Sequence, residues 1–200
     1  MQADEKEVIR EIKRKSIHLI PGFLAIPVVV WLGNPYATLI SLFFLAIYAA
    51  HEASLRLNLP WNVPIASHTF KVMARQEELK ERYFTGSVYF WACTTIIVAL
   101  MEPTRAAAAV MISSFGDAAA AIVGKAIASP AIIYNPRKTL AGSLAMLAAS
   151  LLSCLVASIQ LNTSIIVSLA ATLIESLTRN SVLDELTVPS AAAVLLHLLP

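Results

Sequence analysis

Apolar residues fill seven stretches of the chain, and short polar segments separate them. A helix needs about 20 mainly apolar residues to cross a bilayer, within a range of about 17–25. The pattern therefore predicts an all-α fold, a polytopic transmembrane helix bundle of about seven spans. The predicted spans cover residues 16–33, 35–53, 84–101, 103–124, 139–161, 163–178 and 187–199. The last two are short, so six spans are an alternative.

The first of these stretches contains helix-breaking residues. Pro21 and Pro27 are expected to kink or break the helix, because proline lacks a backbone N–H and its ring crowds the preceding turn. Gly22 lies beside Pro21. We therefore expect the backbone at this point to open toward a cavity.

Composition agrees with a membrane protein. Apolar residues make up 58% of the chain and charged residues 14%, whereas an average soluble domain has about 45–50% and about 25%. The length of 200 residues predicts one domain, residues 1–200. The net charge of +2 and the lack of a basic, aromatic stretch argue against nucleic acid. The charged N-terminus lacks a signal-peptide pattern and is expected to be retained.

Basic residues are distributed unevenly over the predicted loops. Of 15 Lys and Arg, five precede the first span, five lie between the second and third, three between the fourth and fifth, and one between the sixth and seventh. Only Arg105 falls on the other side. By the positive-inside rule, these four segments, of which the N-terminus is one, are cytosolic.

The longest predicted loop, residues 54–83, contains the string KVMARQEELKER. In a helix, Glu78 would pair with Arg82 and Glu77 with Lys80, because residues three or four apart share a face. We therefore expect one helix in this loop, lying against the membrane surface or the bundle.

Asp117 is the single charge in the apolar run 106–124. A carboxylate at membrane depth costs about 2.5–3.5 kcal/mol even on the lenient insertion scale. Helical spacing places Ser113, Ser114, Asp117 and Gly124 on one small, polar face. Asp117 is predicted to hold Mg²⁺ against a polyphosphate, since this ion prefers one or two carboxylates and phosphate oxygens. The alternative is a buried Asp bonded to a neighbouring helix.

The predicted cytosolic loop before the fifth span suits phosphate binding. Lys138 supplies a point charge and Arg137 a planar fork. Thr139 and Ser143, on either side of Gly142, supply hydroxyls and backbone N–H groups at a helix start, which favours anions. The alternative is ordinary membrane anchoring by the basic residues.

Three polar residues stand at the start of the first span. Arg14, Lys15 and His18 occur at i, i+1 and i+4. Arg14 and Lys15 are either phosphate ligands or snorkelling anchors, and His18 is either catalytic or structural. Glu52 and Arg56 are one helical turn apart and are expected to form a pair, which either only neutralises its own charges or also shapes the site.

Three further acids follow near the predicted cytosolic rim. Glu175 lies near the end of the sixth span, and Asp184 and Glu185 follow in a predicted loop. These carboxylates are candidates for a second metal site or for a base acting on an alcohol. The alternative for Asp184 and Glu185 is that they are solvated loop charges.

Taken in order, the polar segments resemble the CTP-dependent polyprenol kinase family, which includes dolichol kinases, phytol kinases and the CTP-dependent diacylglycerol kinase. The resemblance covers nearly the whole chain. The matching segments are RKSIH (14–18), HEASLR (51–56), TGSVYF (85–90), FGDAAAAIVGK (115–125), KTLAGS (138–143) and IESLTRNSVLDELTVP (174–189).

The resemblance implies a CTP site with Mg²⁺ as cofactor, and transfer of the γ-phosphoryl of CTP to a lipid alcohol. Its motif residues match Asp117, Ala120, Gly124, Lys138, Thr139 and Gly142, and the predicted nucleotide site also includes Arg14, Lys15, Ser114, Arg137 and Ser143. Ala128, Ala141 and Glu185 depart from the family pattern. Asp117 with Asp184 and Glu185 would hold the metal, and Glu175, Asp184, Glu185 or His18 would take the hydroxyl proton.

The expected partners are CTP from the cytosol, a lipid alcohol from the bilayer and membrane lipids; the sequence leaves the alcohol and the oligomeric state open. A CTP-dependent cytidylyltransferase acting on a lipid phosphate is the alternative enzyme. A small membrane transporter is the alternative outside enzymes, because buried acids also mark ion pathways.

Overall fold

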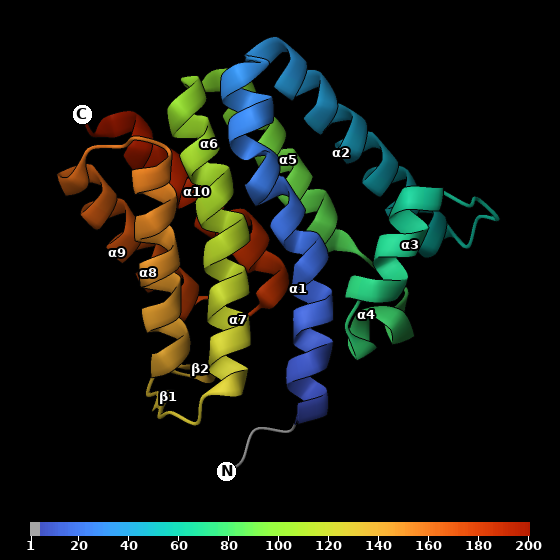
Figure 1. Cartoon of the computed structure of the whole chain (residues 1–200). Coiled ribbons are helices and arrows are strands. Elements are labelled where there is room, and N and C mark those ends of the chain that lie inside the picture. Colours follow the sequence, from blue (N-terminus) through green and yellow to red (C-terminus); the bar gives the residue numbers. More distant parts are fainter. Residues whose placement is uncertain (1–4) are drawn as a thin grey trace.

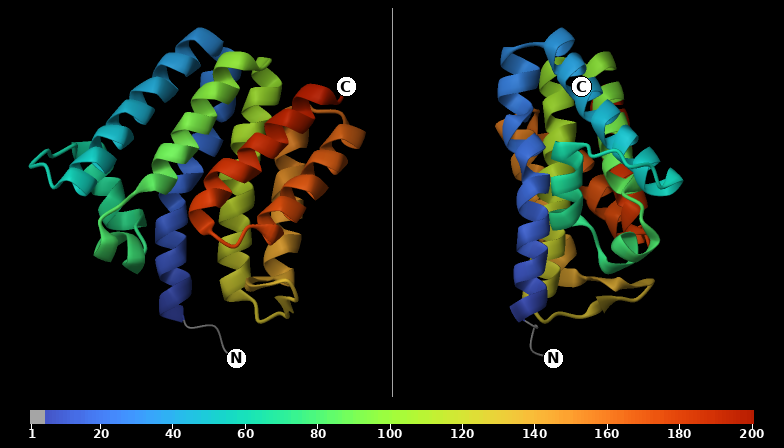
Figure 2. Two further views of the ribbon diagram at one scale, coloured as in Figure 1. Left: turned by 180° about the vertical axis from the view of Figure 1, so that it is seen from behind. Right: turned by 90° about the vertical axis from the view of Figure 1, so that its right-hand side faces the viewer.

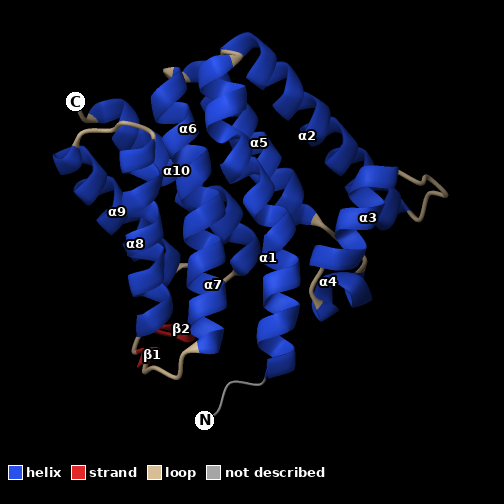
Figure 3. Ribbon diagram, viewed as in Figure 1, coloured by secondary structure: helices blue, strands red, loops and turns tan. Residues whose placement is uncertain are grey.

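The computed structural model describes residues 5–200, and helices account for most of them (Figures 1 and 3). A two-stranded antiparallel hairpin is the exception. In chain order the elements are α1 (Glu5–Ala25), η1 (Ile26–Trp31), α2 (Asn34–Leu57), α3 (Pro64–Met73), α4 (Gln76–Glu81), α5 (Thr85–Leu100), α6 (Pro103–Met111), η2 (Ile112–Gly116), α7 (Asp117–Ala126), β1 (Ala131–Ile132), β2 (Asn135–Thr139), α8 (Leu140–Val156), α9 (Leu161–Leu177) and α10 (Ser181–Leu198).

The long helices run alternately in opposite directions (Figures 1 and 2). The start of α1, the end of α7 and the β1–β2 hairpin lie at one end of the molecule, called here the hairpin end. The connection from α1 to α2 and the C-terminus lie at the opposite end. The short helices α3 and α4 connect α2 to α5 on one flank of the bundle.

The segment α6–η2–α7 forms the centre of the bundle and packs on α1, α8 and α10. Its first part consists of small side chains, and Ala106, Ala107, Ala108 and Ala109 are fully buried. Small residues let helix backbones approach closely. The helix begins at Pro103 because Glu102 accepts hydrogen bonds from the backbone N–H groups of Thr104 and Arg105.

The bundle buries polar as well as apolar side chains, and it exposes many large apolar ones. The serine side chains Ser150, Ser164 and Ser168 are fully buried between helices. Large apolar side chains instead cover the outside of α2, α8 and α9. Exposed examples are Leu39, Phe43, Leu144, Leu152, Leu169 and Leu173.

The predicted all-α class is confirmed apart from the hairpin. Two helical segments are long and apolar enough to cross a membrane, Asn34–Arg56 and Pro103–Ala126. Thr85–Leu100, Leu140–Val156 and Leu161–Leu177 are apolar but shorter.

Of the kink or break predicted at Pro21, the break does not occur. Helix α1 continues through Pro21, and Pro27 lies in the π-helical η1, whose wider turn accommodates the missing N–H. Pro21 lines a cavity, as expected for the backbone at this point, whereas Gly22 itself faces η2. A Cβ atom at Gly22 would lie 2.9 Å from the Phe115 ring and from Ser114, so this glycine permits close packing of α1 on η2.

The loop between the second and third predicted spans holds two helices, α3 and α4, where one was expected. Glu78 accepts a hydrogen bond from the backbone N–H of Arg75 at 2.6 Å and caps α4. Arg82 adopts a left-handed φ of 57° and donates to Asn58 at 2.6 Å. Within residues 5–200, neither of the two ion pairs predicted for this segment is formed. For Glu78 and Arg82 the reason is that α4 ends before Arg82.

Candidate functional site

A polar cavity of about 350 Å³ lies at the hairpin end, between α1, α7, the hairpin, the start of α8 and the α9–α10 connection. We call it the polar cavity. Its charged lining residues are Glu11, Arg14, Arg75, Asp117, Lys125, Arg137, Lys138, Glu175, Arg179 and Asp184, and its small ones are Ala120, Ala121, Gly124, Thr139, Gly142 and Ser143.

Two glycines bring α7 and α8 together at this cavity. A Cβ atom at Gly142 would lie 2.8 Å from the carbonyl oxygen of Ala120 and 3.3 Å from the Cα of Gly124. Thr139 caps α8 by accepting a hydrogen bond from the Gly142 N–H at 3.2 Å. The N–H groups of Leu140 and Ala141 are bonded to Pro130 and Ser129, so the start of α8 offers the cavity the positive end of its helix dipole.

Lys138, at the end of β2, forms two ion pairs. Its ammonium group lies 2.5 Å from a Glu175 oxygen and 2.9 Å from an Asp184 oxygen. Burial acts to lower the pKa of Lys138, but the two carboxylates outweigh it and raise that pKa. Asp184 thus belongs to the Lys138 cluster. Both Asp184 and Glu185 lie in helix α10, where the sequence predicted a loop, and Asp184 is buried.

A second cluster surrounds Asp117, which follows directly after the π-helical η2. Lys15 forms an ion pair with Asp117. The His18 Nε2 atom lies 3.4 Å from an Asp117 oxygen and 3.7 Å from a Glu185 oxygen. The ligand atoms of His18, Asp117 and Glu185 all lie within 4.8 Å of one another, which is close enough to share one ion.

The polar atoms of this second cluster are incompletely satisfied. Among the residues that the structure describes, the buried His18 Nε2 and Glu185 Oε2 atoms have no hydrogen-bond partner. Such orphaned atoms point to a missing water, ion or ligand. Two carboxylates plus phosphate oxygens fit Mg²⁺. Lys15 already neutralises part of the charge on Asp117, so a metal would share this carboxylate with the lysine.

At the edge of the polar cavity, Glu11 joins two basic residues. It pairs with Arg14 and with Lys125, whose ammonium group lies 2.8 Å away. Burial acts to raise the pKa of Glu11, but Arg14 and Lys125 outweigh it and lower that pKa to about 2. Glu11 therefore stays ionised and joins α1 to α7 at the cavity mouth.

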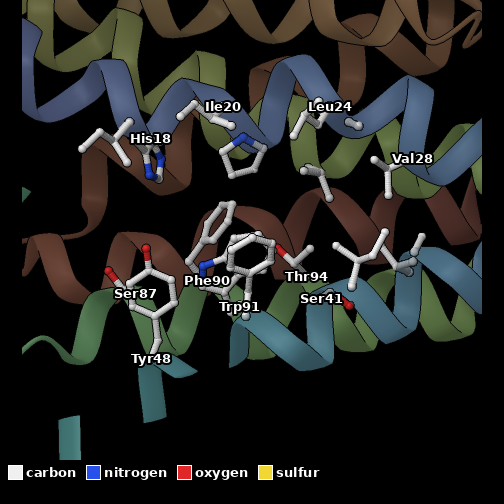
Figure 4. Close-up of a pocket in the computed structure, with 18 of the residues that line it drawn as sticks. His18, Ile20, Leu24, Val28, Ser41, Tyr48, Ser87, Phe90, Trp91 and Thr94 are labelled. Carbon is white, nitrogen blue, oxygen red and sulfur yellow. The ribbon is translucent and has the colours of Figure 1, made fainter. Parts of the chain in front are cut away.

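An apolar groove of about 260 Å³ runs along α1, facing α2 and α5 (Figure 4). We call it the apolar groove. Figure 4 shows His18 at one end and Val28 toward the other, with Phe90 and Trp91 across from α1. Its titratable lining residues are His18, Tyr48 and Glu185.

The two spaces meet at His18, Asp117 and Glu185, here called the junction. Asp117 lines the polar cavity, whereas His18 and Glu185 line the apolar groove. Only 3.4 Å separates His18 from Asp117. His18 also has a backbone hydrogen bond to Ser113, which fixes its ring. A ligand group bound at the His18 end of the apolar groove would therefore lie beside a ligand group bound near Asp117 in the polar cavity.

Most of the predicted site residues lie together. Those that line the polar cavity are Arg14, Asp117, Ala120, Gly124, Arg137, Lys138, Thr139, Gly142, Ser143, Glu175 and Asp184. Lys15 is buried against Asp117, outside the cavity lining. Ser114 does not line it either and packs against Gly22, because the π-helical turn rotates Ser114 away from the Asp117 face.

The predicted Glu52–Arg56 pair is confirmed, with 2.6 Å between Arg56 Nε and Glu52. Glu52 also accepts hydrogen bonds from the backbone N–H of Phe84 and from the Thr85 hydroxyl. The pair therefore joins α2 to the start of α5. Neither residue lines the polar cavity or the apolar groove.

Four charged residues of the polar cavity were not among the predicted site residues: Glu11, Arg75, Lys125 and Arg179. Glu11 precedes Arg14 by three positions, a spacing that signals a pair on one helix face. Arg75 lies between α3 and α4, and Arg179 lies between α9 and α10. Their positions depend on how α4 and the hairpin fold back, which no local spacing reveals.

Comparison of the chain with protein-family models, with curated proteins and with solved structures gives no match.

Proposed function

We propose that this chain is an integral membrane kinase that transfers the γ-phosphoryl group of CTP to the hydroxyl of a lipid alcohol, giving a lipid monophosphate and CDP. The observation that carries the proposal is the junction. A charged cavity suited to polyphosphate and an apolar groove suited to a lipid chain meet at one histidine and two carboxylates.

The membrane setting is supported by the surface of the bundle. Large apolar side chains cover α2, α8 and α9, and buried serines lie between helices, the pattern expected when lipid replaces water as the solvent. The basic residues concentrate toward the hairpin end, so by the positive-inside rule this end faces the cytosol. Seven alternating helical segments then cross the membrane.

The donor phosphates would bind in the polar cavity. Lys138, Arg14 and Arg137 supply positive charge, and the positive end of the α8 dipole adds to it. Asp117 and Glu185 are the residues that would hold Mg²⁺. When bound, this ion would neutralise charge on the phosphate oxygens.

The alcohol would lie with its chain in the apolar groove and its hydroxyl at the junction. His18 Nε2 is unpartnered and points to the same small space as the Asp117 and Glu185 oxygens. A neutral His18 can accept a proton there, and its hydrogen bond to Ser113 holds the ring in place.

The reaction then follows from this placement. The hydroxyl oxygen forms a bond to the γ-phosphorus while the bond from that phosphorus to the β–γ bridging oxygen breaks. The hydroxyl proton passes to His18, and the bridging electrons leave with CDP. Phosphoryl transfer depends mainly on positioning and charge neutralisation, which the two ion clusters of the cavity supply.

The test uses purified protein in lipid vesicles with Mg²⁺, a panel of lipid alcohols, and CTP labelled at the γ- or the α-phosphate. We expect label in lipid from γ-labelled CTP alone. Label from α-labelled CTP alone, with a lipid phosphate present, would show a cytidylyltransferase. No label from either form, or from ATP, would favour a transporter.

A separate labelling experiment tests the orientation. Cys93 and Cys154 are buried, so the thiol reagent should label them little. Labelling of an introduced cysteine can therefore be measured directly. In intact cells, a membrane-impermeant thiol reagent should label Thr104→Cys and should label Lys13→Cys only after permeabilisation. The reverse pattern would contradict the proposed orientation.

A further inference from the structure

A second large polar space adjoins the polar cavity and takes no part in the junction. This rim cavity of about 690 Å³ lies between the segment around α4, the β1–β2 hairpin and the α9–α10 connection. Arg75, Arg137 and Arg179 line both spaces. An anion extended out of the polar cavity would therefore pass these arginines into the rim cavity.

The rim cavity and the polar cavity differ in their aromatic residues, which matters for binding the base of a nucleotide. None of the described residues that line the polar cavity is aromatic. The rim cavity is lined by Tyr83 and Tyr134. Stacking on an aromatic ring is the most general way for a protein to hold a base, because every base has a π-face.

Tyr134 is held in one place although half of its surface is exposed. Its hydroxyl forms a 2.8 Å hydrogen bond with Ser176, and its carbonyl oxygen accepts from Arg179 at 3.3 Å. The neighbouring Asn135 is buried and donates to the carbonyl oxygens of Ser176 and Thr178. The hairpin is thus fixed to the end of α9, and it presents a preorganised ring to the rim cavity.

Asn180 adds a polar group of defined orientation. Its side-chain oxygen accepts from the Val182 N–H at 2.9 Å and caps α10. The oxygen is therefore oriented toward the helix, and the amide N–H groups are the part that a ligand in the rim cavity can meet. Such donors suit the carbonyl and ring-nitrogen acceptors of a base.

We propose that the rim cavity binds the nucleoside half of the phosphate donor, with the base on Tyr134 and the phosphates passing Arg137 and Arg179 toward Lys138. The inference rests on the proposed function for the identity of the donor. It assigns recognition of the base to the hairpin and the α9–α10 connection. Arg137 and Arg179 would then lie between the base and the junction.

The test compares binding of CTP with binding of inorganic tripolyphosphate to the purified full chain in detergent with Mg²⁺. Tyr134→Ala should weaken CTP binding about tenfold, the size expected for loss of one stacking contact, and should leave tripolyphosphate binding within about twofold. Asn180→Ser, which keeps a capping side chain, should also weaken CTP binding alone. Tyr36→Ala, an exposed tyrosine on α2, is the control and should change neither.

Equal weakening of both ligands by Tyr134→Ala, or no effect on CTP, would overturn the inference. Photocrosslinking of 5-iodo-CTP to the unmodified protein needs no variant to fold. Attachment within 75–83, 133–137 or 179–182 supports the rim cavity, and attachment confined to other segments contradicts it. Wild-type protein that binds CTP through Tyr134 but transfers no γ-phosphoryl would refute the proposed function and leave the nucleoside site standing.

Discussion

Lys15 and Asp117, on different helices, form an ion pair in which the lysine side chain is only 2% exposed. The pair explains how a carboxylate can lie within an otherwise uncharged apolar helix, because each charge offsets the burial cost of the other. It also leaves Asp117 beside His18 and Glu185. The same carboxylate is thus both a structural partner and a member of the junction.

Variants of this ion pair should distinguish the contribution of Asp117 to stability from its contribution to activity. Asp117→Asn leaves Lys15 buried without its counter-ion, and such a loss costs about 3–5 kcal/mol of the free energy of unfolding. The double variant Lys15→Met with Asp117→Asn should recover most of this stability, since neither charge is left alone. It should not recover phosphoryl transfer. Denaturation in detergent measures the first effect, and a double variant no more stable than Asp117→Asn would contradict the pairing.

Lys138 should act on the donor and not on the acceptor. Lys138→Met removes a charge-assisted contact to phosphate and should raise the KM for CTP about tenfold or more, with the KM for the alcohol unchanged. Lys138→Arg keeps the charge and should lose less. Lys13→Met, at an exposed position on α1, is the matched control. Equal changes in both KM values would show that Lys138 supports the fold alone.

The apolar groove should limit the length of the alcohol chain. From His18 to Val28 it follows about ten helical residues, a rise of roughly 15 Å at 1.5 Å per residue. Val28→Trp would fill its far part, so activity toward long-chain alcohols should fall at least about tenfold while short-chain alcohols are spared. Val156→Trp, at an exposed position on α8, controls for the added bulk. A uniform loss for all chain lengths would argue against the groove as the acceptor site.

The contact between α7 and α8 should tolerate no added methyl group. In Gly142→Ala the new Cβ would lie 2.8 Å from the Ala120 carbonyl oxygen, and overpacking of this kind typically costs about 1–3 kcal/mol. Gly86→Ala is the control, because its Cβ would meet the nearest atom, in Glu185, at an ordinary 3.7 Å. Thermal unfolding should show a lower Tm for Gly142→Ala alone; equal Tm values would contradict the close approach.

Glu11 should stabilise the fold across the neutral range and lose its effect only in acid. Its pKa of about 2 lies below the ordinary value of 4.5, so its contribution is complete above about pH 4.5 and is lost as the pH falls toward 2. The stability difference between wild type and Glu11→Gln should be constant from about pH 6 to 8 and shrink below about pH 4.5. A difference that changes between pH 6 and 8 would contradict this.

The sequence predicted much of the helical framework and the composition of the site. The spacing of apolar runs located the long helices, and the burial cost of Asp117 singled out the residue at the junction. Lys138, Thr139 and Gly142 were predicted as one phosphate-binding segment, and they do lie together at the start of α8, in the lining of the polar cavity.

What the sequence did not predict depends on contacts between distant segments or on small changes of helix geometry. The π-helical η2 moves Ser114 away from the Asp117 face, and no residue spacing announces such a turn. Asp184 and Glu185 are neighbours in sequence but join different clusters, because adjacent helical side chains point in different directions. The hairpin positions Arg137 and Tyr134 through its contacts with α9, which are long-range.

The central claim is that the junction transfers phosphate from a nucleotide to a lipid alcohol, and the most direct measurement is transfer of label from γ-labelled CTP in vesicles by wild type and Asp117→Asn in parallel. We predict labelled lipid monophosphate from the wild type and a loss of at least about a thousandfold in the variant, which is roughly 4 kcal/mol of transition-state stabilisation. Unlabelled lipid from the wild type, or equal labelling by the two proteins, would contradict the account.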